Sequence, residues 1–184
     1  MKPLFIIFHF LMLQATHTLF DFSDDADISS WTVVNDGVMG GRSKGHFSLT
    51  EEGHGLFRGV VSLENNGGFS MVQHGFRSLD VSGYRSLVLV LKGDGKDYQV
   101  RVKTARNDYY SYTCPIKTNG EWQTIVIPFN KMMPQFRGRR LPDPPFPGKH
   151  LQEVAILIGN KKAEEFAIEI SRISVSTALP EATD

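Results

Sequence analysis

Short stretches in which apolar and polar residues alternate run through most of this chain, and each ends in a turn sequence. The alternation is strict at residues 98–102 and 166–170. A repeat of two residues is that of a β-strand with one buried and one solvent-facing side. Strands this short, separated by Gly, Asn and Pro, predict about nine or ten strands with hardly any helix, in an antiparallel sandwich or barrel.

Two local patterns make this expectation more specific. Residues 56–64 and 69–73 flank the sequence Asn-Asn-Gly-Gly at residues 65–68. Asn-Gly pairs supply the positive φ angles of tight turns, so we expect a hairpin here. In the last apolar segment the alternation shifts by one residue at Ser171-Arg172, which predicts a β-bulge.

The first eighteen residues differ from the rest. Lys2 precedes an apolar run at residues 4–13, and more polar residues follow up to Thr18, which is the order of a secretory signal peptide. The run is too short to cross a bilayer as a helix, and the lack of arginine before Arg42 argues against a transit peptide. We therefore expect residues 1–18 to be a signal peptide.

With that leader cleaved, the mature chain has no expected membrane span and is predicted to be secreted or periplasmic. With the leader retained, a cytoplasmic or membrane-associated protein is the alternative. At 184 residues the chain fits one domain, which we place at residues 19–178, followed by a flexible tail at 179–184.

Composition argues against several functions. Twenty basic residues balance twenty acidic ones, so nothing steers the chain towards nucleic acid. Cys114 is the single cysteine, which excludes an intramolecular disulfide. The six histidines lack metal-ligand spacing, and no nucleophile or phosphate-loop motif is present. We therefore expect no metal, no cofactor and no catalytic residue.

Two polar, glycine-rich corners stand between the apolar segments, at residues 35–43 and 63–69. Turn geometry explains the glycines, and an aspartate there caps a turn by accepting hydrogen bonds from the following amides. It does not explain an apolar Val-Met pair inside such a loop, so a contact surface for a partner is the second interpretation. The candidate binding residues of this surface are Asp36, Val38, Met39, Arg42, Asn65 and Asn66.

Two further hypotheses involve sugars. A carbohydrate-binding module would use the polar rim and a stacking platform, although aromatic residues at strand spacing more often pack in a core. The aromatic candidates are Tyr98, Tyr109, Tyr110, Tyr112 and Trp122. A glycosidase would need two carboxylates at a defined distance. Its candidates are Asp36, Glu64 and Asp94. Two of them also have a structural interpretation, Asp36 as a turn cap and Glu64 as a solubilising residue before a hairpin.

A third candidate region follows the strand that ends at Pro128. Residues 129–136 suit a short helical turn, and the proline-rich residues 137–150 suit a long surface loop. Basic residues beside an aromatic ring and extended proline-rich backbone suit the docking of an acidic protein segment, and a solvated loop is the alternative. The residues concerned are Arg137, Arg139, Arg140 and Phe146.

Three runs resemble the complex I intermediate-associated protein family, at residues 31–43, 57–69 and 166–175. The resemblance implies a galactose-binding-like jelly-roll β-sandwich. It also implies a non-enzymatic assembly factor or chaperone that contacts respiratory complex I subunits or assembly intermediates. Fold transfers between relatives more safely than function, so a protein-binding role leads and a carbohydrate-binding role is the alternative.

Overall fold

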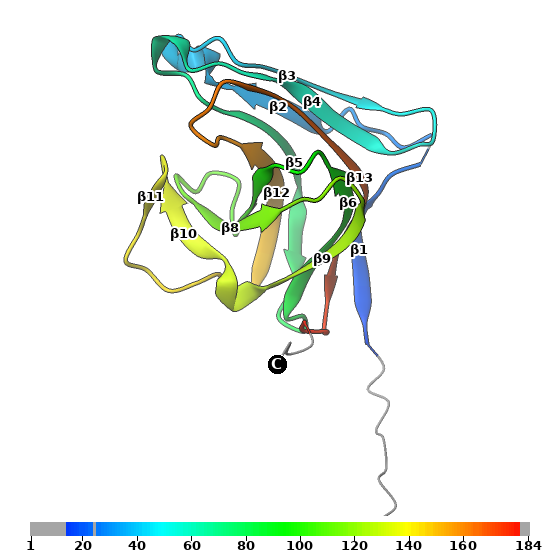
Figure 1. Ribbon diagram of the computed structural model, residues 1–184. Helices are drawn as coiled ribbons and strands as arrows, with labels where there is room; N and C mark the ends of the chain where they lie inside the picture. The colour runs from blue at the N-terminus through cyan, green and yellow to red at the C-terminus, as the bar shows by residue number, and fades with distance from the viewer. Residues whose placement is uncertain (1–13, 24, 181–184) are drawn as a thin grey trace, which may run out of the picture.

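The computed structural model describes residues 14–23 and 25–180. Within this range, only the backbone of residues 38 and 39 is described, and not their side chains. These residues form an all-β sandwich of two antiparallel sheets (Figure 1). Its strands are β1 (Thr16–Asp21), β2 (Trp31–Asn35), β3 (Lys44–Leu49), β4 (Gly55–Val61), β5 (Ser70–Asp80), β6 (Ser86–Gly93), β7 (Asp97–Lys103), β8 (Ser111–Lys117), β9 (Trp122–Pro128), β10 (Met133–Phe136), β11 (Arg139–Arg140), β12 (His150–Ile158) and β13 (Glu164–Ser176). Single turns of 3₁₀ helix are η1 (Asp36–Met39), η2 (Glu64–Asn66) and η3 (Phe129–Lys131).

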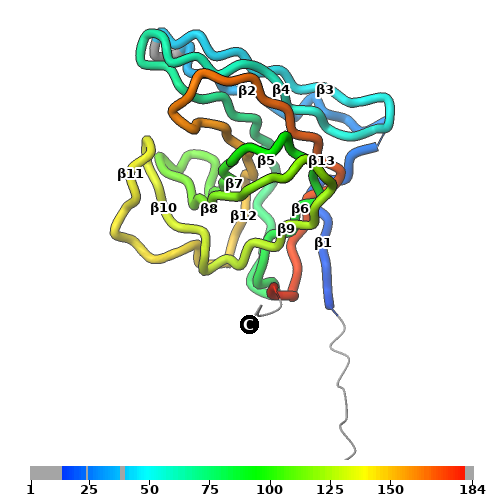
Figure 2. The backbone as a smooth tube through the Cα atoms, viewed as in Figure 1, coloured from blue at the N-terminus to red at the C-terminus, as the bar shows by residue number. Residues whose placement is uncertain are grey.

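The two sheets divide the strands unequally. One sheet has the order β3-β4-β13-β6-β9, with β1 paired to the far part of β13. The other has the order β11-β10-β8-β7-β12-β5-β2. Figure 2 shows β10 and β11 curling beside β8 at one side of this seven-stranded sheet. The alternating strands predicted an antiparallel sandwich or barrel, and the family resemblance implied a jelly roll; the jelly-roll sandwich is confirmed.

The core lies between the facing sides of the two sheets, where alternate residues of each strand are buried. Phe57 of β4 and Tyr98 of β7 are among its largest fully buried side chains. Complete burial of one such aliphatic or aromatic side chain contributes about 1.5–3 kcal/mol, so the sheets are held together chiefly by this layer. The expected β-bulge is confirmed, because the register between β13 and β6 shifts between Ile170 and Arg172.

The expected hairpin between residues 56–64 and 69–73 is wrong. β4 pairs with β3 and β13 in one sheet, whereas β5 pairs with β12 and β2 in the other. Asn65 and Asn66 do take positive φ angles, of 55° and 59°. The chain uses them to pass from one sheet to the other through η2, and not to fold one strand back on its neighbour.

Other elements follow the sequence more closely. The expected helical turn is η3, and it ends at Lys131, where the chain becomes strand β10. Residues 137–149 are irregular apart from the two-residue strand β11, and β12 begins at His150, the last residue of the expected loop. The first strand begins at Thr16 and pairs with β13, so pairing starts before the expected domain boundary at Leu19. The expected signal-peptide run lies mostly outside the described residues. Within the part of the chain that the structure describes, no helix is long and apolar enough to cross a membrane.

Candidate functional site

The Asp36 carboxylate lies at the centre of the two glycine-rich corners. One oxygen, Oδ1, accepts a hydrogen bond from the Ser43 amide at 3.0 Å. The other, Oδ2, accepts from the Ser43 hydroxyl at 2.5 Å and from the amides of Gly68 at 2.6 Å and Phe69 at 3.3 Å. The residue is 1% exposed. Asp36 therefore joins the corner at residues 35–43 to the corner at residues 63–69.

Neighbouring polar groups reinforce this junction. Asn35 Oδ1 accepts from the amide of Gly45 at 3.0 Å and from the hydroxyl of Ser70 at 2.6 Å. The Ser43 hydroxyl also accepts a hydrogen bond from the Ser62 amide at 3.0 Å. These bonds join the end of β2 to β3 and to β5, and the corner at residues 35–43 to the residue after β4. Together they satisfy backbone groups that would otherwise be buried without partners, which is costly.

Two glycines of the corners are required by the buried carboxylate and not by turn geometry. A Cβ built on Gly41 would collide with the Asp36 carboxyl group, and one on Gly67 would lie 2.6 Å from Asp36 Oδ2. Neither glycine has a positive φ angle, whereas Gly40 (86°) and Gly68 (145°) do. The glycine content of this signature therefore has two separate causes, which are backbone conformation and space for one carboxylate.

The charge on Asp36 is favoured by its partners. Burial by itself raises the pKa of this carboxyl group, but the hydrogen bonds from Ser43, Gly68 and Phe69 outweigh that and hold the pKa below its ordinary value. Every hydrogen bond that the structure gives to the Asp36 carboxylate comes from a group of the protein itself. Asp36 therefore has an architectural role in this structure, and its part in binding a partner stays a prediction.

The other corner residues are distributed around this junction. Arg42 pairs with Glu64 at 2.7 Å, with both side chains well exposed. Asn65 donates a hydrogen bond from Nδ2 to the Gly40 carbonyl at 3.1 Å, whereas Asn66 lines a surface hollow. The side chains of Val38 and Met39, which carried the contact-surface hypothesis, lie outside the described residues, and that part of the hypothesis stays a prediction.

The three carboxylates of the glycosidase hypothesis do not share a site. Asp36 is enclosed by its own loops, and Glu64 is exposed and paired with Arg42. Asp94 accepts from Lys96 Nζ at 2.7 Å, from the Tyr98 hydroxyl at 3.0 Å and from the amide of Ala167 at 3.0 Å. Residues 14–23 and 25–180 also contain no group of three His, Cys, Asp or Glu side chains placed to hold a metal ion.

A different surface has the form of a binding site. It is the outer face of the seven-stranded sheet, which is the face turned away from the core. Residues paired directly across antiparallel strands share a face, so the register defines which side chains lie there. One row of paired residues runs Met133, Thr113, Arg101, Ala155, Gln73 and Thr32, and the next runs Pro115, Gln99, Leu157, Met71 and Val34.

Three hollows in this region are continuous with one another and form what we call the outer groove. The central hollow, of about 430 Å³, is lined by β5, β7, β12 and β10 and by the loop before β8. It shares Gln99 and Gln135 with a second hollow of about 240 Å³. It shares Gly68, Phe69 and Arg137 with a third hollow of about 370 Å³, which is bounded by the Asp36 junction.

The floor of the outer groove is partly apolar. Ala155 and Leu157 of β12 are only 2% and 6% exposed, yet they lie outside the cluster that fills the space between the sheets. Leu157 lines the central hollow, and Ala155 lies on the same face between Arg101 and Gln73, its partners in the neighbouring strands. A mostly enclosed floor with a few convergent polar groups is the usual form of a ligand site.

Charged groups of the groove are strongly affected by burial. Arg101 Nη2 donates to Gln99 Oε1 at 2.9 Å, and burial lowers its pKa, although a guanidinium stays charged in proteins. Glu153 is 7% exposed, and burial raises its pKa against the opposing attraction of Lys103 and Arg106. Lys103 Nζ lies 3.8 Å from the Glu153 carboxylate. The groove thus holds charges of both signs at low solvent access.

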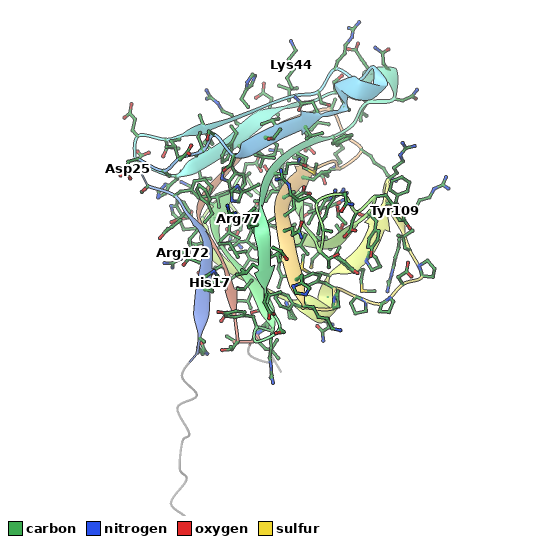
Figure 3. The ribbon with its side chains drawn as sticks, turned by 180° about the vertical axis from the view of Figure 1, so that it is seen from behind. His17, Asp25, Lys44, Arg77, Tyr109 and Arg172 are labelled. Carbon is green, nitrogen blue, oxygen red and sulfur yellow. The ribbon has the colours of Figure 1, made fainter. Side chains whose placement is uncertain are left out.

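Aromatic rings form one wall of the groove. The Tyr109 side chain is 67% exposed and meets Phe136 edge to face, with ring centroids 5.3 Å apart. Figure 3 shows Tyr109 projecting beside the β10–β11 hairpin, far from Lys44 on the other sheet. Asp108 fixes the loop before Tyr109 by accepting hydrogen bonds from the Thr104 hydroxyl and the Ala105 amide.

The remaining aromatic candidates are elsewhere. Tyr98 and Tyr112 are buried and belong to the core. Trp122 is 42% exposed on β9 of the six-stranded sheet, where it contacts His54. Phe146 of the proline-rich segment is also buried, between Phe129 and Tyr112. Of the expected stacking platform, only Tyr109 and Tyr110 line the groove.

Sequence reasoning missed most of the groove, because its residues occupy the alternate positions that read as solvent-facing. Gln99, Arg101 and Lys103 were the polar half of the clearest alternation. One signal was available: residues 154–158 are apolar without alternation, which indicates a strand covered on both faces. On its outer side, this strand forms the enclosed floor of the groove.

The fold is a jelly-roll β-sandwich with a groove on the outer face of one sheet. Among solved structures it is similar to the family 11 carbohydrate-binding module of a cellulosomal cellulase from Clostridium thermocellum, with a TM-score of 0.64, 14% identity and 92% and 98% coverage of the two chains. A family model for complex I intermediate-associated protein 30 (CIA30) matches residues 20–170. The chain therefore belongs to the CIA30 family.

Two curated relatives carry that family's name, "Complex I intermediate-associated protein 30, mitochondrial". The protein from Drosophila melanogaster is 27% identical over an alignment of 146 positions that covers 67% of this chain and 49% of the relative. The protein from Mus musculus is 24% identical over an alignment of 190 positions, gaps included, that covers 91% of this chain and 58% of the relative. The chain spans about half the length of these relatives.

The relatives' names correct the expected localisation. A secreted or periplasmic protein was expected from the apolar run and the lack of early arginine, but the relatives are named mitochondrial. The expectation rested on the sequence of the run alone. The run itself lies outside the described residues. A short apolar stretch after one lysine is a weak marker of export, and a missing arginine is a weak argument against mitochondria.

The space around Asp36 leads to a first prediction. Gly41→Ala should destabilise the protein by about 1–3 kcal/mol, since the new methyl group collides with the carboxyl group and one of them must move. Gly37→Ala, in the same corner, should change stability by less than about 0.5 kcal/mol, because nothing lies within 4 Å of its Cβ position. Urea unfolding measures both, and equal losses would contradict this account of the glycines.

The charge on Asp36 leads to a second prediction. Because its pKa is lower folded than unfolded, its contribution to stability is present above the unfolded value, about 3.9, and is lost as the pH falls through the folded value. Asp36→Asn should therefore cost about 2–4 kcal/mol at pH 7 and progressively less below pH ~4. Asp97→Asn, which removes an exposed carboxylate, is the control and should change little. A deficit for Asp36→Asn that is independent of pH would refute the charge-based explanation.

Proposed function

We propose that this chain is a non-enzymatic, mitochondrial binding protein that takes part in complex I assembly by holding a segment of a partner in the outer groove. The partner would be a complex I subunit or an assembly intermediate, held in a chaperone-like way. Membership of the CIA30 family supports the process. The observation that carries the site is the continuous groove with an enclosed floor, polar groups and an aromatic wall.

The charge arrangement in the groove supports binding in preference to hydrolysis. Glycoside hydrolysis needs two carboxyl groups facing one bond. The described lining of the groove contains two carboxylates, Glu153 and Asp36, and Asp36 is occupied by the protein's own amides and hydroxyl. Only Glu153 is therefore left to act on a ligand in the groove.

Filling the groove tests this function. Ser111 lines the central hollow, and Ser111→Trp would occupy it with a large side chain. In cells lacking this chain, we expect the wild type to restore mature complex I on native gels and Ser111→Trp to restore less than about a tenth as much. Ser48→Trp places the same side chain at an exposed position on β3 of the other sheet and should restore fully.

Expression level and thermal stability are compared for both variants, so that misfolding is recognised. Full restoration by a stable Ser111→Trp protein would show that the groove is not used. A normal level of complex I in cells lacking the chain would refute the assembly role itself.

Carbohydrate binding is the second candidate, and it is favoured by Tyr109, Tyr110 and Phe136 beside polar side chains on the groove wall. Aromatic faces combined with hydrogen-bonding groups suit sugar rings. Calorimetric titration with a mixed-linked β-glucan tetrasaccharide tests it. Saturable binding that Tyr109→Ala abolishes would support this candidate over the first, and no heat at millimolar sugar would exclude this ligand.

A further inference from the structure

The outer groove is cationic, although the chain as a whole is electrically balanced. Its described lining contains six cationic side chains and two carboxylates, whereas the whole chain has twenty of each sign. The Asp36 carboxylate is already occupied by hydrogen bonds from the protein's own hydroxyl and amides, and Glu153 lies against Lys103. The cations follow one another along the groove in pairs: Lys131 and Arg140, then Arg101 and Lys103, then Arg137 and Lys161.

Two buried polar atoms on the groove face lack partners among the described residues. They are Nε of Arg101 and Oγ1 of Thr113. The two residues are paired directly across β7 and β8, so both side chains point into the same face. Thr113 is only 8% exposed. A buried donor without an acceptor is costly, and an oxygen of a bound ligand would remove that cost.

The third pair of cations is held on unfavourable backbone. Among the described residues other than glycine, four have positive φ angles, and three of them line the third hollow: Asn66, Arg137 and Lys161. Asparagine tolerates this conformation, but long side chains rarely adopt it. Arg137 (48°) and Gly138 (78°) form the two-residue turn between β10 and β11, where Asn-Gly would be preferred. Strain of this kind concentrates at functional sites.

From these three observations we infer that the outer groove binds an extended polypeptide segment rich in carboxylates. This inference rests on the proposed function and specifies the chemistry of the partner. Carboxylates spaced along an extended chain match cations spaced along a groove. Between the outer pairs of cations, Arg101 and Thr113 supply neighbouring donors from the central and second hollows. A neutral sugar would leave the cations unpaired, and a single phosphate would need several donors converging at one point, whereas these are spread over three hollows.

A fluorescein-labelled decapeptide of alternating Glu and Ser serves as the probe, and its Gln-Ser counterpart is the neutral control. Fluorescence anisotropy at low salt should show saturable binding of the Glu-Ser peptide and at least about tenfold weaker binding of the Gln-Ser peptide. The double variant Arg137→Asn/Lys161→Asn should weaken binding about tenfold. Because asparagine relieves the backbone strain, its melting temperature should not fall.

The matched control is Lys44→Gln/Arg58→Gln, which removes one lysine and one arginine from exposed positions on β3 and β4 of the other sheet. It should leave the affinity unchanged. Thr113→Val keeps the charge and the shape, and it should weaken binding several-fold if the hydroxyl contacts the peptide. Equal weakening by the control variant, or no preference for Glu over Gln, would overturn the inference.

Three further outcomes separate this inference from the function on which it rests. If anionic phospholipid vesicles bind the groove and the Glu-Ser peptide does not, the acidic-segment inference is wrong. If the Asn double variant restores complex I fully while Ser111→Trp does not, the groove is used but its ligand is not acidic. If Ser111→Trp also restores complex I, the groove function itself fails.

Discussion

A single buried carboxylate organises the part of this protein that identifies its family. Asp36 fixes the end of β2 to the start of β3 and to the passage between β4 and β5. That passage carries the chain from one sheet to the other, and its residues Gly68 and Phe69 also bound the outer groove. Because the anion needs space as well as donors, Gly41 and Gly67 are constrained along with it. The position of the groove wall therefore depends on this interaction.

The groove follows from the alternation of strands. Each strand of the seven-stranded sheet gives one set of side chains to the core and the other set to the outer face. The β10–β11 hairpin and the loop bearing Tyr109 rise at one side of that face, and the Asp36 junction bounds the other (Figures 1 and 3). Side chains between them, such as Arg101 and Glu153, lose much of their solvent, which strengthens the hydrogen bonds and ion pairs that such groups can make.

Sequence alone gave the fold class and the bulge at Ser171-Arg172, because the period of apolar residues directly encodes burial. It failed at residues 65–68, where the positive φ angles of a hairpin turn serve a passage between sheets, and local sequence does not distinguish the two. The corner chemistry was noticed, but the partners of Asp36 come from residues up to 33 positions away. The groove was missed because its lining extends from Val34 to Lys161, and only the fold brings these residues together.

We expect partners to meet the outer groove and not the exposed Arg42 side of the corner at residues 35–43, and site-specific photocrosslinking in isolated mitochondria tests this most directly. A photoreactive amino acid replaces Gln135 in the groove, Arg42 at the corner or Ser48 on the other sheet, one at a time. We expect a crosslink to a complex I subunit or assembly intermediate from position 135 and none from positions 42 and 48. Crosslinking from position 42 with none from position 135 would contradict the account.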